Sequence, residues 1–238
     1  MLGTFSKTSD PLVVEAIANS GMDFIIIDLE HGYINYETLR NHLLALSNYK
    51  IKKIVRVPSS SYKYMYKSFE LGSDSILVPN VKSVDEITNI CNNVFFSPSG
   101  ERGICKYVRD NHYGKNHVSK YLENSKNKEI IIQIEGKNSL DDFENFIKID
   151  KIKNYMIGPY DLSNSLNIPG DINNPLIEHE VKNLINISKK NNISLGIYCD
   201  DWNEARKWKK LGINFVAINV DLSVILTSYK NILKKING

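Results

Sequence analysis

Short apolar runs alternate with longer amphipathic stretches along the whole chain. The runs are near-continuous and rich in Ile and Val, as in the FIIID of residues 24–28, which is typical of strands covered on both faces in a parallel sheet. We predict eight such strands, at residues 2–5, 24–28, 53–57, 75–79, 129–135, 154–159, 195–199 and 215–220. Eight strands that alternate with helices close a (β/α)8 barrel. A doubly wound open sheet usually has fewer strands and often a glycine-rich phosphate turn, which is missing here. We therefore expect an α/β fold of the TIM-barrel type, as one domain over residues 1–238.

The ends of the helices are marked by glycines and by capping residues. Three glycines each follow a helical stretch and precede an apolar run, where a helix C-cap needs a left-handed residue: they are Gly21, Gly72 and Gly212. Helix starts are expected at four capping residues, Asp10, Ser83, Ser139 and Asp201. These joints are those of a chain in which helices and parallel strands alternate.

Polar side chains gather where the predicted strands end, which is where barrel enzymes carry their chemistry. They are Asp28 and His31 after the second strand, Arg56 near the end of the third, Gln133 and Glu135 at the end of the fifth, and Asp161 after the sixth. Asp161 has a simpler explanation as a helix cap, and His31 as a structural imidazole. Together, the set offers oxygen ligands for a hard divalent cation, an arginine for a carboxylate and a candidate acid-base group.

Composition and charge narrow the class of protein. Hydrophobic residues make up 42% and charged residues 24%, a balance that favours a globular core over disorder. The net charge is only +3 and the lysines are spread along the chain, so nucleic-acid binding is not expected. No apolar run is long enough to span a bilayer. Cys91, Cys105 and Cys199 are far apart and lack a C-x-x-C, which favours a reducing compartment. We expect a cytoplasmic protein with no membrane partner.

The connection between the fourth and fifth strands is unusually long. Residues 96–128 form an insertion of a size that is usually a lid or an interaction element. It contains Arg102, Arg109, His112 and Tyr113, most of which fit a solvated loop. Only Arg102, framed by glycine in SGERG, suggests a fixed geometry.

Seven stretches of the chain together resemble one known family. GTF, DFIIIDLEHG, VRVP, ILVPNV, SGERG, IQIEG and IGPYDLS resemble, in order, the signature stretches of the HpcH/HpaI-type class II pyruvate aldolases, over nearly the whole chain. The resemblance implies a (β/α)8 barrel of the phosphoenolpyruvate/pyruvate type. It implies a metal-dependent enzyme that cleaves or forms a 2-oxo-4-hydroxy acid, with pyruvate and an aldehyde as the other partners of the reaction. It also implies a homo-oligomer, commonly a hexamer.

The same resemblance implies a role for each polar residue. Glu135 and Asp161 would bind a divalent metal ion, Mg²⁺, Mn²⁺ or Co²⁺. Arg56 would bind the pyruvyl unit and offset charge on its enolate, and Asp28 and His31 would form an acid-base dyad. The substrate-binding residues would be Arg56, Gln133, Gly158, Tyr160 and Asp161, with backbone amides around Tyr160 on the substrate carboxylate.

The chain departs from the family pattern at two positions, so the sequence does not identify the aldehyde that the enzyme would use. Glu70 stands where the family usually has an aspartate, and Asn80 where a methionine is common. We expect Tyr198, Cys199 and the insertion to shape the acceptor pocket.

Three alternative functions remain. An acyl-CoA lyase of the malyl- or citramalyl-CoA type also uses a Glu and Asp metal pair. A class I aldolase would need a lysine inside a barrel strand, and the nearest candidates, Lys53 and Lys137, lie at a strand start and beyond a strand end. The chain could also be a non-catalytic sugar-acid binder that kept the barrel.

Overall fold

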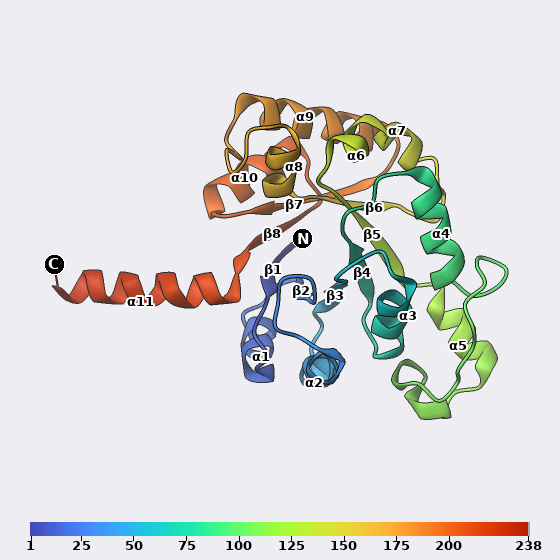
Figure 1. Cartoon of the computed structure of the whole chain (residues 1–238). Coiled ribbons are helices and arrows are strands. Elements are labelled where there is room, and N and C mark those ends of the chain that lie inside the picture. Colours follow the sequence, from blue (N-terminus) through green and yellow to red (C-terminus); the bar gives the residue numbers. More distant parts are fainter. Residues whose placement is uncertain (238) are drawn as a thin grey trace.

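Eight parallel strands form a closed barrel surrounded by helices (Figure 1). The computed structural model describes residues 1–237 of the chain. The strands are β1 (Leu2–Ser6), β2 (Phe24–Asp28), β3 (Lys52–Arg56), β4 (Ser75–Val78), β5 (Glu129–Ile134), β6 (Asn154–Ile157), β7 (Ser194–Cys199) and β8 (Phe215–Val220). They pair in chain order, and β8 closes on β1. The predicted TIM barrel and all eight predicted strands are confirmed.

Several predicted strands extended too far at their carboxyl ends. The structure ends β4 at Val78, β5 at Ile134 and β6 at Ile157. At β6 the reason is local, because Gly158 is the N-cap of the next helix and Pro159 occupies its first turn.

Helices follow the strands, and most of them cover the outside of the barrel, whereas the last one extends away from it (Figure 1). They are α1 (Pro11–Asn19), α2 (Tyr36–Ala45), α3 (Tyr62–Glu70), α4 (Val84–Val94), α5 (Val118–Ser125), α6 (Lys137–Asp141), α7 (Phe143–Phe146), α8 (Pro159–Ser165), α9 (Pro175–Lys190), α10 (Trp202–Leu211) and α11 (Asp221–Asn237), with short 3-10 helices η1 (Leu46–Asn48) and η2 (Arg109–Gly114). Among the described residues, no helix has the length and hydrophobicity that crossing a bilayer requires.

Most of the predicted helix ends are confirmed. The three predicted C-cap glycines have positive φ angles: Gly21 (87°), Gly72 (99°) and Gly212 (114°). Asp10, Ser83 and Asp201 each accept a hydrogen bond from a backbone N–H in the first turn of α1, α4 and α10.

The predicted helix start at Ser139 was wrong. The helix α6 begins two residues earlier, after an extended Gly136, and Ser139 is its third residue. The Ser139 hydroxyl accepts a hydrogen bond from the Gly136 N–H at 3.2 Å, so it stabilises the helix start from inside the first turn.

The inside of the barrel is filled by its own apolar cluster, distinct from the clusters between strands and helices. Two of its rings, Phe24 and Phe215, pack edge to face with centroids 5.8 Å apart. Gly3 and Gly196, on the strands next to them, leave the room, because a Cβ at either position would overlap a Phe ring. This packing closes the interior below the carboxyl ends of the strands.

The insertion after α4 packs against the body through its two arginines. The Arg109 guanidinium donates to the carbonyl of Leu71 at 2.6 Å, at the end of α3. The Arg102 side chain is buried, with its guanidinium 4.4 Å from the centre of the Phe96 ring and its Nη2 3.7 Å from Oε1 of Glu70 in α3. The fixed geometry expected of Arg102 is therefore present, and it anchors the insertion to the barrel.

Candidate active site

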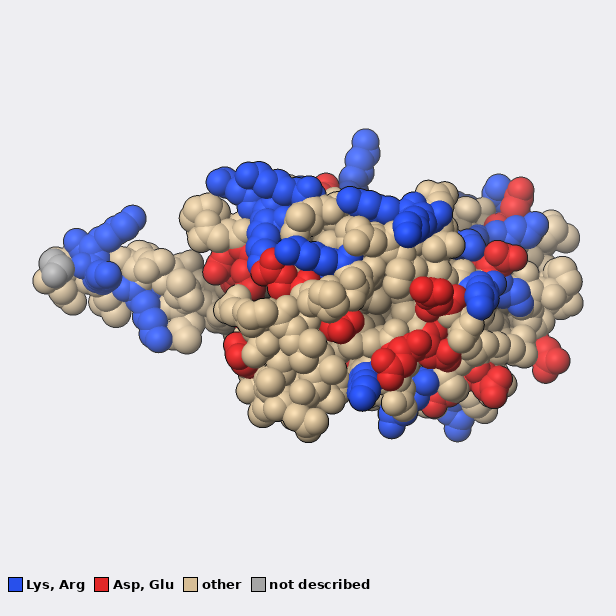
Figure 2. Space-filling model, turned by 90° about the horizontal axis from the view of Figure 1, so that it is seen from above, with Lys and Arg blue, Asp and Glu red and all other residues tan. Residues whose placement is uncertain are grey.

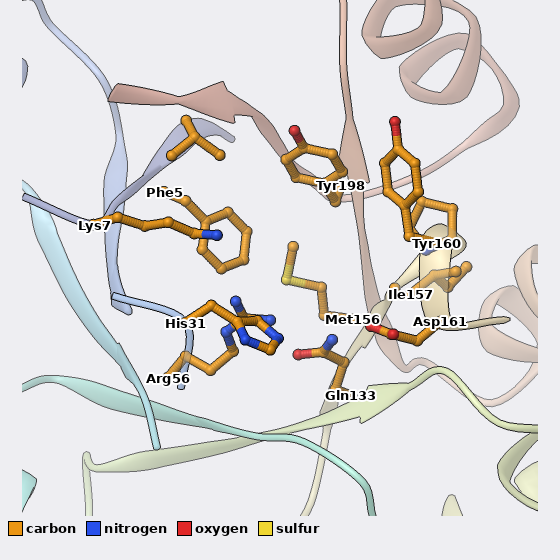
Figure 3. A pocket seen from close by; sticks show the side chains of 13 residues that line it. Phe5, Lys7, His31, Arg56, Gln133, Met156, Ile157, Tyr160, Asp161 and Tyr198 are labelled. Carbon is orange, nitrogen blue, oxygen red and sulfur yellow. The ribbon is translucent and has the colours of Figure 1, made fainter. Parts of the chain in front are cut away.

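A pocket of about 300 Å³ opens at the carboxyl ends of the strands (Figure 3). It is lined by Phe5, Lys7, His31, Arg56, Gln133, Met156, Ile157, Gly158, Pro159, Tyr160, Asp161, Tyr198 and Val220. Six of the eight predicted site residues are in this set. The other two, Asp28 and Glu135, each accept a hydrogen bond from a lining side chain. The structure therefore brings all eight together.

Arg56, at the end of β3, is fixed by two acids that come from β2 and the turn after it. Its Nε and Nη2 donate to the two carboxylate oxygens of Asp28 at 2.9 and 2.7 Å. Its Nη1 lies 3.1 Å from Oε2 of Glu30. Asp28 and Arg56 are paired residues of neighbouring strands, so the sheet register itself places them side by side. Two of the five N–H donors of the guanidinium are used in hydrogen bonds to Asp28, Nη1 is paired with Glu30, and the side chain lines the pocket.

Burial and the charge of Arg56 shift the pKa values of Asp28 and Glu30 in opposite directions. Burial alone would raise the pKa of Asp28, but the hydrogen bonds and charge of Arg56 outweigh it, and the pKa lies below its ordinary value. Burial raises the pKa of Glu30, and Arg56 offsets only part of that effect. Burial opposes the charge of Arg56 as well, but the two acids raise its pKa. Asp28 and Arg56 therefore form an ionised pair at neutral pH.

The predicted dyad between Asp28 and His31 is not formed by their side chains. The backbone N–H groups of Glu30 and His31 donate to Oδ1 of Asp28 at 3.1 and 3.2 Å. The imidazole lies 3.8 Å from Oε2 of Glu30, and 57% of the side chain is exposed. The physical reason is that Arg56 already occupies both oxygens of Asp28. Asp28 positions the arginine and the turn, while His31 faces the pocket (Figure 3).

Glu135 is the buried carboxylate that the alternation in β5 singled out. Its Oε1 accepts a hydrogen bond from the backbone N–H of Asn80 at 2.5 Å, and its Oε2 accepts one from the Gln133 amide. Asn80 has a φ of 58°, a left-handed conformation that asparagine adopts more readily than methionine. Gly158 lies against the same pair, where a Cβ would be 2.8 Å from the Gln133 amide nitrogen. Gln133 and Glu135 therefore face the mouth together, as predicted.

Glu135 and Asp161 line a common second pocket, and Asp161 lines the first pocket as well. Burial raises the pKa of Glu135 to about 7; the Asn80 N–H offsets only part of this, and the charges of Asp161 and Glu30 raise it further. Within residues 1–237, neither Glu135 nor Asp161 forms an ion pair with a Lys, Arg or His side chain. Glu135, which is buried, therefore lacks the cation that a buried acid needs, and Asp161 is an exposed carboxylate that lines the same pocket.

The donor set at this point fits a hard divalent cation. Two carboxylates line this pocket, and the amide oxygen of Gln133, whose nitrogen donates to Glu135, is buried without a hydrogen-bond partner. No group of three or more His, Cys, Asp or Glu side chains that could bind a metal occurs in the described part of the chain. A cation bound here would therefore take the rest of its ligands from substrate and water, as Mg²⁺ commonly does.

Lys7 is a pocket residue that the sequence analysis missed. Its ammonium enters from the end of β1, across the pocket from Asp161 (Figure 3). It lies 3.8 Å from Oδ2 of Asp28, and 30% of the side chain is exposed. The predicted strand stopped at Phe5; extending the rule that residues after a strand face the mouth would have identified the lysine.

Neither of the two lysines named from the sequence lines the pocket that Lys7 enters. Lys53 pairs with Asp74 at 3.0 Å near the start of β3, at the opposite end of the strand from the pocket. Lys137 lines the second pocket, beside Glu135.

Two tyrosines form the wall of the pocket across from Arg56. The hydroxyls of Tyr198 and Tyr160 donate to the two oxygens of Asp200 at 3.0 and 2.5 Å. The bond to Asp200, with burial, raises the pKa of Tyr160 to about 12. The expectation for Cys199 and the insertion was wrong, since neither lines this pocket. The alternation of β7 turns Cys199 into the layer between barrel and helices, and the insertion packs beside α3.

A comparison with known protein families shows which family the chain belongs to. The model of the HpcH/HpaI aldolase/citrate lyase family matches residues 1–228. The chain belongs to this family.

Curated members of the HpcH/HpaI family are distant but cover almost the whole chain. A 5-keto-4-deoxy-D-glucarate aldolase of Klebsiella pneumoniae is 26% identical over 224 residues, which is 94% of this chain and 87% of the relative. A hydroxypyruvate/pyruvate aldolase of Pseudomonas aeruginosa is 25% identical over 239 residues, 100% of this chain and 88% of the relative.

Solved structures of the HpcH/HpaI type share the fold. A family protein from Burkholderia cenocepacia matches with a TM-score of 0.94 at 24% identity, over 100% of this chain and 95% of that one. The citrate lyase beta subunit from M. tuberculosis, solved with oxaloacetate and magnesium, matches with a TM-score of 0.61 at 13% identity, over 92% and 90%.

Proposed function

We propose that this protein is a divalent-metal-dependent aldolase that cleaves or forms a 2-oxo-4-hydroxy acid, with pyruvate and an aldehyde as partners. The observation that carries the proposal is the pair of carboxylates, Glu135 and Asp161, that share one pocket and, among the described residues, form no ion pair with a basic side chain. The aldolases among its relatives support it.

Glu135 and Asp161 would hold the cation, and Mg²⁺, Mn²⁺ or Co²⁺ suits their oxygen donors. The bound ion would supply Lewis acidity toward the keto oxygen of the 2-oxo acid. Gln133 would hold Glu135 in place through its amide hydrogen bond. Gly158 lets the α8 start approach this pair, and the free N–H groups of the first turn of α8, around Tyr160, would bind the substrate carboxylate.

Arg56 would place its remaining N–H donors and a positive charge beside the oxygen on which the enolate charge develops. Its guanidinium is already fixed by Asp28 and Glu30, so little reorganisation is needed during the reaction. An arginine without such partners would first have to change its conformation to contact the substrate.

His31 would carry the proton. In cleavage, the imidazole takes the proton of the C4 hydroxyl while the C3–C4 bond breaks and its electron pair moves into the enolate. The aldehyde leaves, and a proton transferred to C3, which balances the one that His31 took up, completes pyruvate. His31 suits this role because its ring lines the pocket and is not engaged by Asp28.

Deuterium exchange tests the pyruvate half of the reaction without knowledge of the aldehyde. Pyruvate in heavy water should lose its methyl proton signal in NMR spectra when enzyme and Mg²⁺ are both present. Chelation should stop the exchange, and Mn²⁺ or Co²⁺ should restore it. Glu135→Gln should abolish it, whereas Glu144→Gln on the exposed face of α7 should not. Exchange that persists in chelator would refute the proposal.

Lys7 supports one competing function, a class I aldolase that forms an imine with pyruvate, because its amine lines the pocket. Borohydride added with pyruvate separates the two mechanisms. The metal-dependent aldolase should keep its activity, while an imine enzyme should gain a covalent adduct that Lys7→Met prevents. A screen of 2-oxo-4-hydroxy acids, with pyruvate detected as product, then identifies the aldehyde.

A further inference from the structure

The carboxylate of Asp200 takes the hydroxyl protons of both tyrosines that line the pocket. Asp200 directly follows β7, and its two oxygens accept hydrogen bonds from Tyr198 at 3.0 Å and from Tyr160 at 2.5 Å. We call these two residues the tyrosine wall. A tyrosine hydroxyl has a single proton, and a carboxylate can only accept. Toward the pocket, the two phenol oxygens can therefore accept a hydrogen bond but cannot donate one.

The backbone of Asp200 is held by the elements on both sides of it. Its N–H donates to Oε2 of Glu204 in α10 at 3.2 Å, and its carbonyl accepts from the Asn219 amide of β8 at 3.3 Å. Within residues 1–237, its carboxylate forms no ion pair with a Lys, Arg or His side chain. The hydroxyls of the tyrosine wall thus supply the hydrogen bonds that this half-buried carboxylate needs, which keeps both protons turned toward it.

The rings of the tyrosine wall are packed as well. The Tyr198 ring lies edge to face with Phe5, with centroids 5.8 Å apart, and its centroid is 6.3 Å from that of Tyr160. Phe5 also contacts Arg56, whose guanidinium carbon is 4.9 Å from the centre of the ring. Phe5 therefore lies between Arg56 and the tyrosine wall and keeps the two apart at a fixed spacing.

The opposite side of the pocket offers hydrogen-bond donors. Arg56, Lys7 and His31 lie there, across from the tyrosine wall (Figure 3). A guanidinium and an ammonium group can only donate. Between the two sides the lining is apolar, with Phe5 and Met156. The pocket thus has one side that donates hydrogen bonds and one side that accepts them.

A neutral hydroxyl group suits the accepting side better than a cationic amine does. Basic and acidic side chains are intermixed over the face of the body in Figure 2, and the net charge is only +3, so the outer surface does not select the charge of the substrate. Inside the pocket, an ammonium group could donate to the tyrosine wall, but it would be repelled by Arg56 and Lys7. A hydroxyl group gains the same hydrogen bond without that repulsion.

We propose that Asp200 is a positioning residue that fixes the tyrosine wall as a hydrogen-bond acceptor, so that the site favours an aldehyde with a hydroxyl group on the carbon next to its carbonyl. The inference rests on the proposed aldolase reaction, in which the 2-oxo acid end of the substrate lies at Glu135 and Asp161 and the C4 oxygen at His31. The pocket of about 300 Å³ leaves room for few carbons beyond C4, so the next carbon lies beside the wall. A carbonyl oxygen at that carbon would meet a phenol oxygen with no proton between them, which is unfavourable.

The test compares two aldehydes of the same carbon skeleton as acceptors for pyruvate, with initial rates of aldol addition. Lactaldehyde carries a hydroxyl group next to its aldehyde carbon, and methylglyoxal carries a carbonyl there. Both react with the same enolate, so any change in the pyruvate half of the reaction cancels in the ratio of their kcat/KM values.

Asp200→Asn keeps the shape of the side chain but changes its hydrogen bonds. The amide oxygen accepts one tyrosine proton, while the amide nitrogen donates to the other phenol, whose own proton is then free to donate into the pocket. Relative to lactaldehyde, methylglyoxal should gain about tenfold in kcat/KM, the effect of one hydrogen bond. Tyr198→Phe removes a hydroxyl without freeing a proton, so it should weaken the reaction of lactaldehyde and give methylglyoxal no gain.

Asp201→Asn is the matched control, because it makes the same change one residue along. Asp201 is exposed and accepts from the N–H groups of Asn203 and Glu204 at the start of α10, where asparagine caps equally well. This variant should keep the wild-type ratio. An unchanged ratio in Asp200→Asn, or an equal gain for methylglyoxal in Asp201→Asn or Tyr198→Phe, would overturn the inference while pyruvate exchange persists. Absence of both product and pyruvate exchange in the wild type would overturn the aldolase assignment, and the inference with it.

Discussion

Glu135→Gln is the perturbation that tests the candidate site most directly, even with no substrate present. In the metal-free protein, burial, with repulsion from Asp161 and Glu30, raises the pKa of Glu135 to about 7. The glutamine keeps the shape: its amide oxygen can accept from the Asn80 N–H, and its amide nitrogen can donate to the unpartnered oxygen of Gln133 once that amide is rotated.

The size of the effect follows from the difference in pKa between the folded and unfolded chain. An ordinary glutamate pKa is near 4.5, so the gap of about 2.5 pKa units corresponds to roughly 3 kcal/mol in the free energy of unfolding. Because the pKa is raised, the folded state binds more protons. The stability that Glu135 contributes is therefore complete below about pH 4.5 and is lost as the pH rises to about 7. Above pH 7 the loss is complete.

Urea unfolding in chelator, from pH 5 to pH 8.5, measures this difference. Wild-type protein should lose stability across the window relative to Glu135→Gln, and the gap should level off above about pH 7. At pH 8, Mg²⁺ at about 100 times its dissociation constant should restore close to 3 kcal/mol to the wild type and little to the variant. Parallel pH curves for the two proteins, or equal stabilisation of both by Mg²⁺, would refute the reasoning.

Three further substitutions address the other side chains of the pocket. Arg56→Ala leaves the buried carboxylate of Asp28 without its partner, and we expect a loss of about 3–5 kcal/mol in urea unfolding as well as loss of pyruvate exchange; unchanged stability would contradict the ion pair. His31→Ala should lower aldol cleavage by about 10²- to 10⁴-fold while Mg²⁺ affinity, measured by calorimetry, stays the same; loss of the metal would assign the imidazole to the cation instead. Lys7→Met should raise KM for an aldehyde that carries a carboxylate far more than for a neutral one of similar size, because the ammonium faces the end of the pocket opposite Asp161; equal effects on both would place the lysine outside acceptor binding.

The fold could be predicted because the two signals that define it are local. The apolar runs gave all eight strands, and glycines at 21, 72 and 212 marked helix ends by a backbone conformation that other residues rarely adopt. The prediction for Ser139 failed because two kinds of helix start share one residue type. A serine can cap from the position before a helix, or stabilise the start from inside the first turn, and only the backbone of Gly136 separates the two cases.

The membership of the site could be predicted, but its pairings could not. Strand ends place residues at a common mouth, so the eight named residues lie in or directly beside one pocket. Which carboxylate binds which cation depends on register across neighbouring strands, and a single strand does not contain that information. Asp28 was assigned to His31, three residues away in sequence, whereas the sheet pairs it with Arg56, 28 residues away.

The structure explains why polar residues stand at the end of the apolar run of β2 and directly after it. Asp28 is completely buried, and its two oxygens receive the Arg56 guanidinium and the N–H groups of the turn that follows. Glu30, two residues on, reaches the third nitrogen of the same arginine. The turn is thus closed through backbone N–H groups instead of the imidazole, which leaves His31 free to face the pocket. Since one carboxylate fixes both the cation and the turn, a shift of either partner by one residue would turn the arginine or the histidine away from the pocket. Buried Asp28, at the end of an apolar strand, therefore holds both Arg56 and His31 in place.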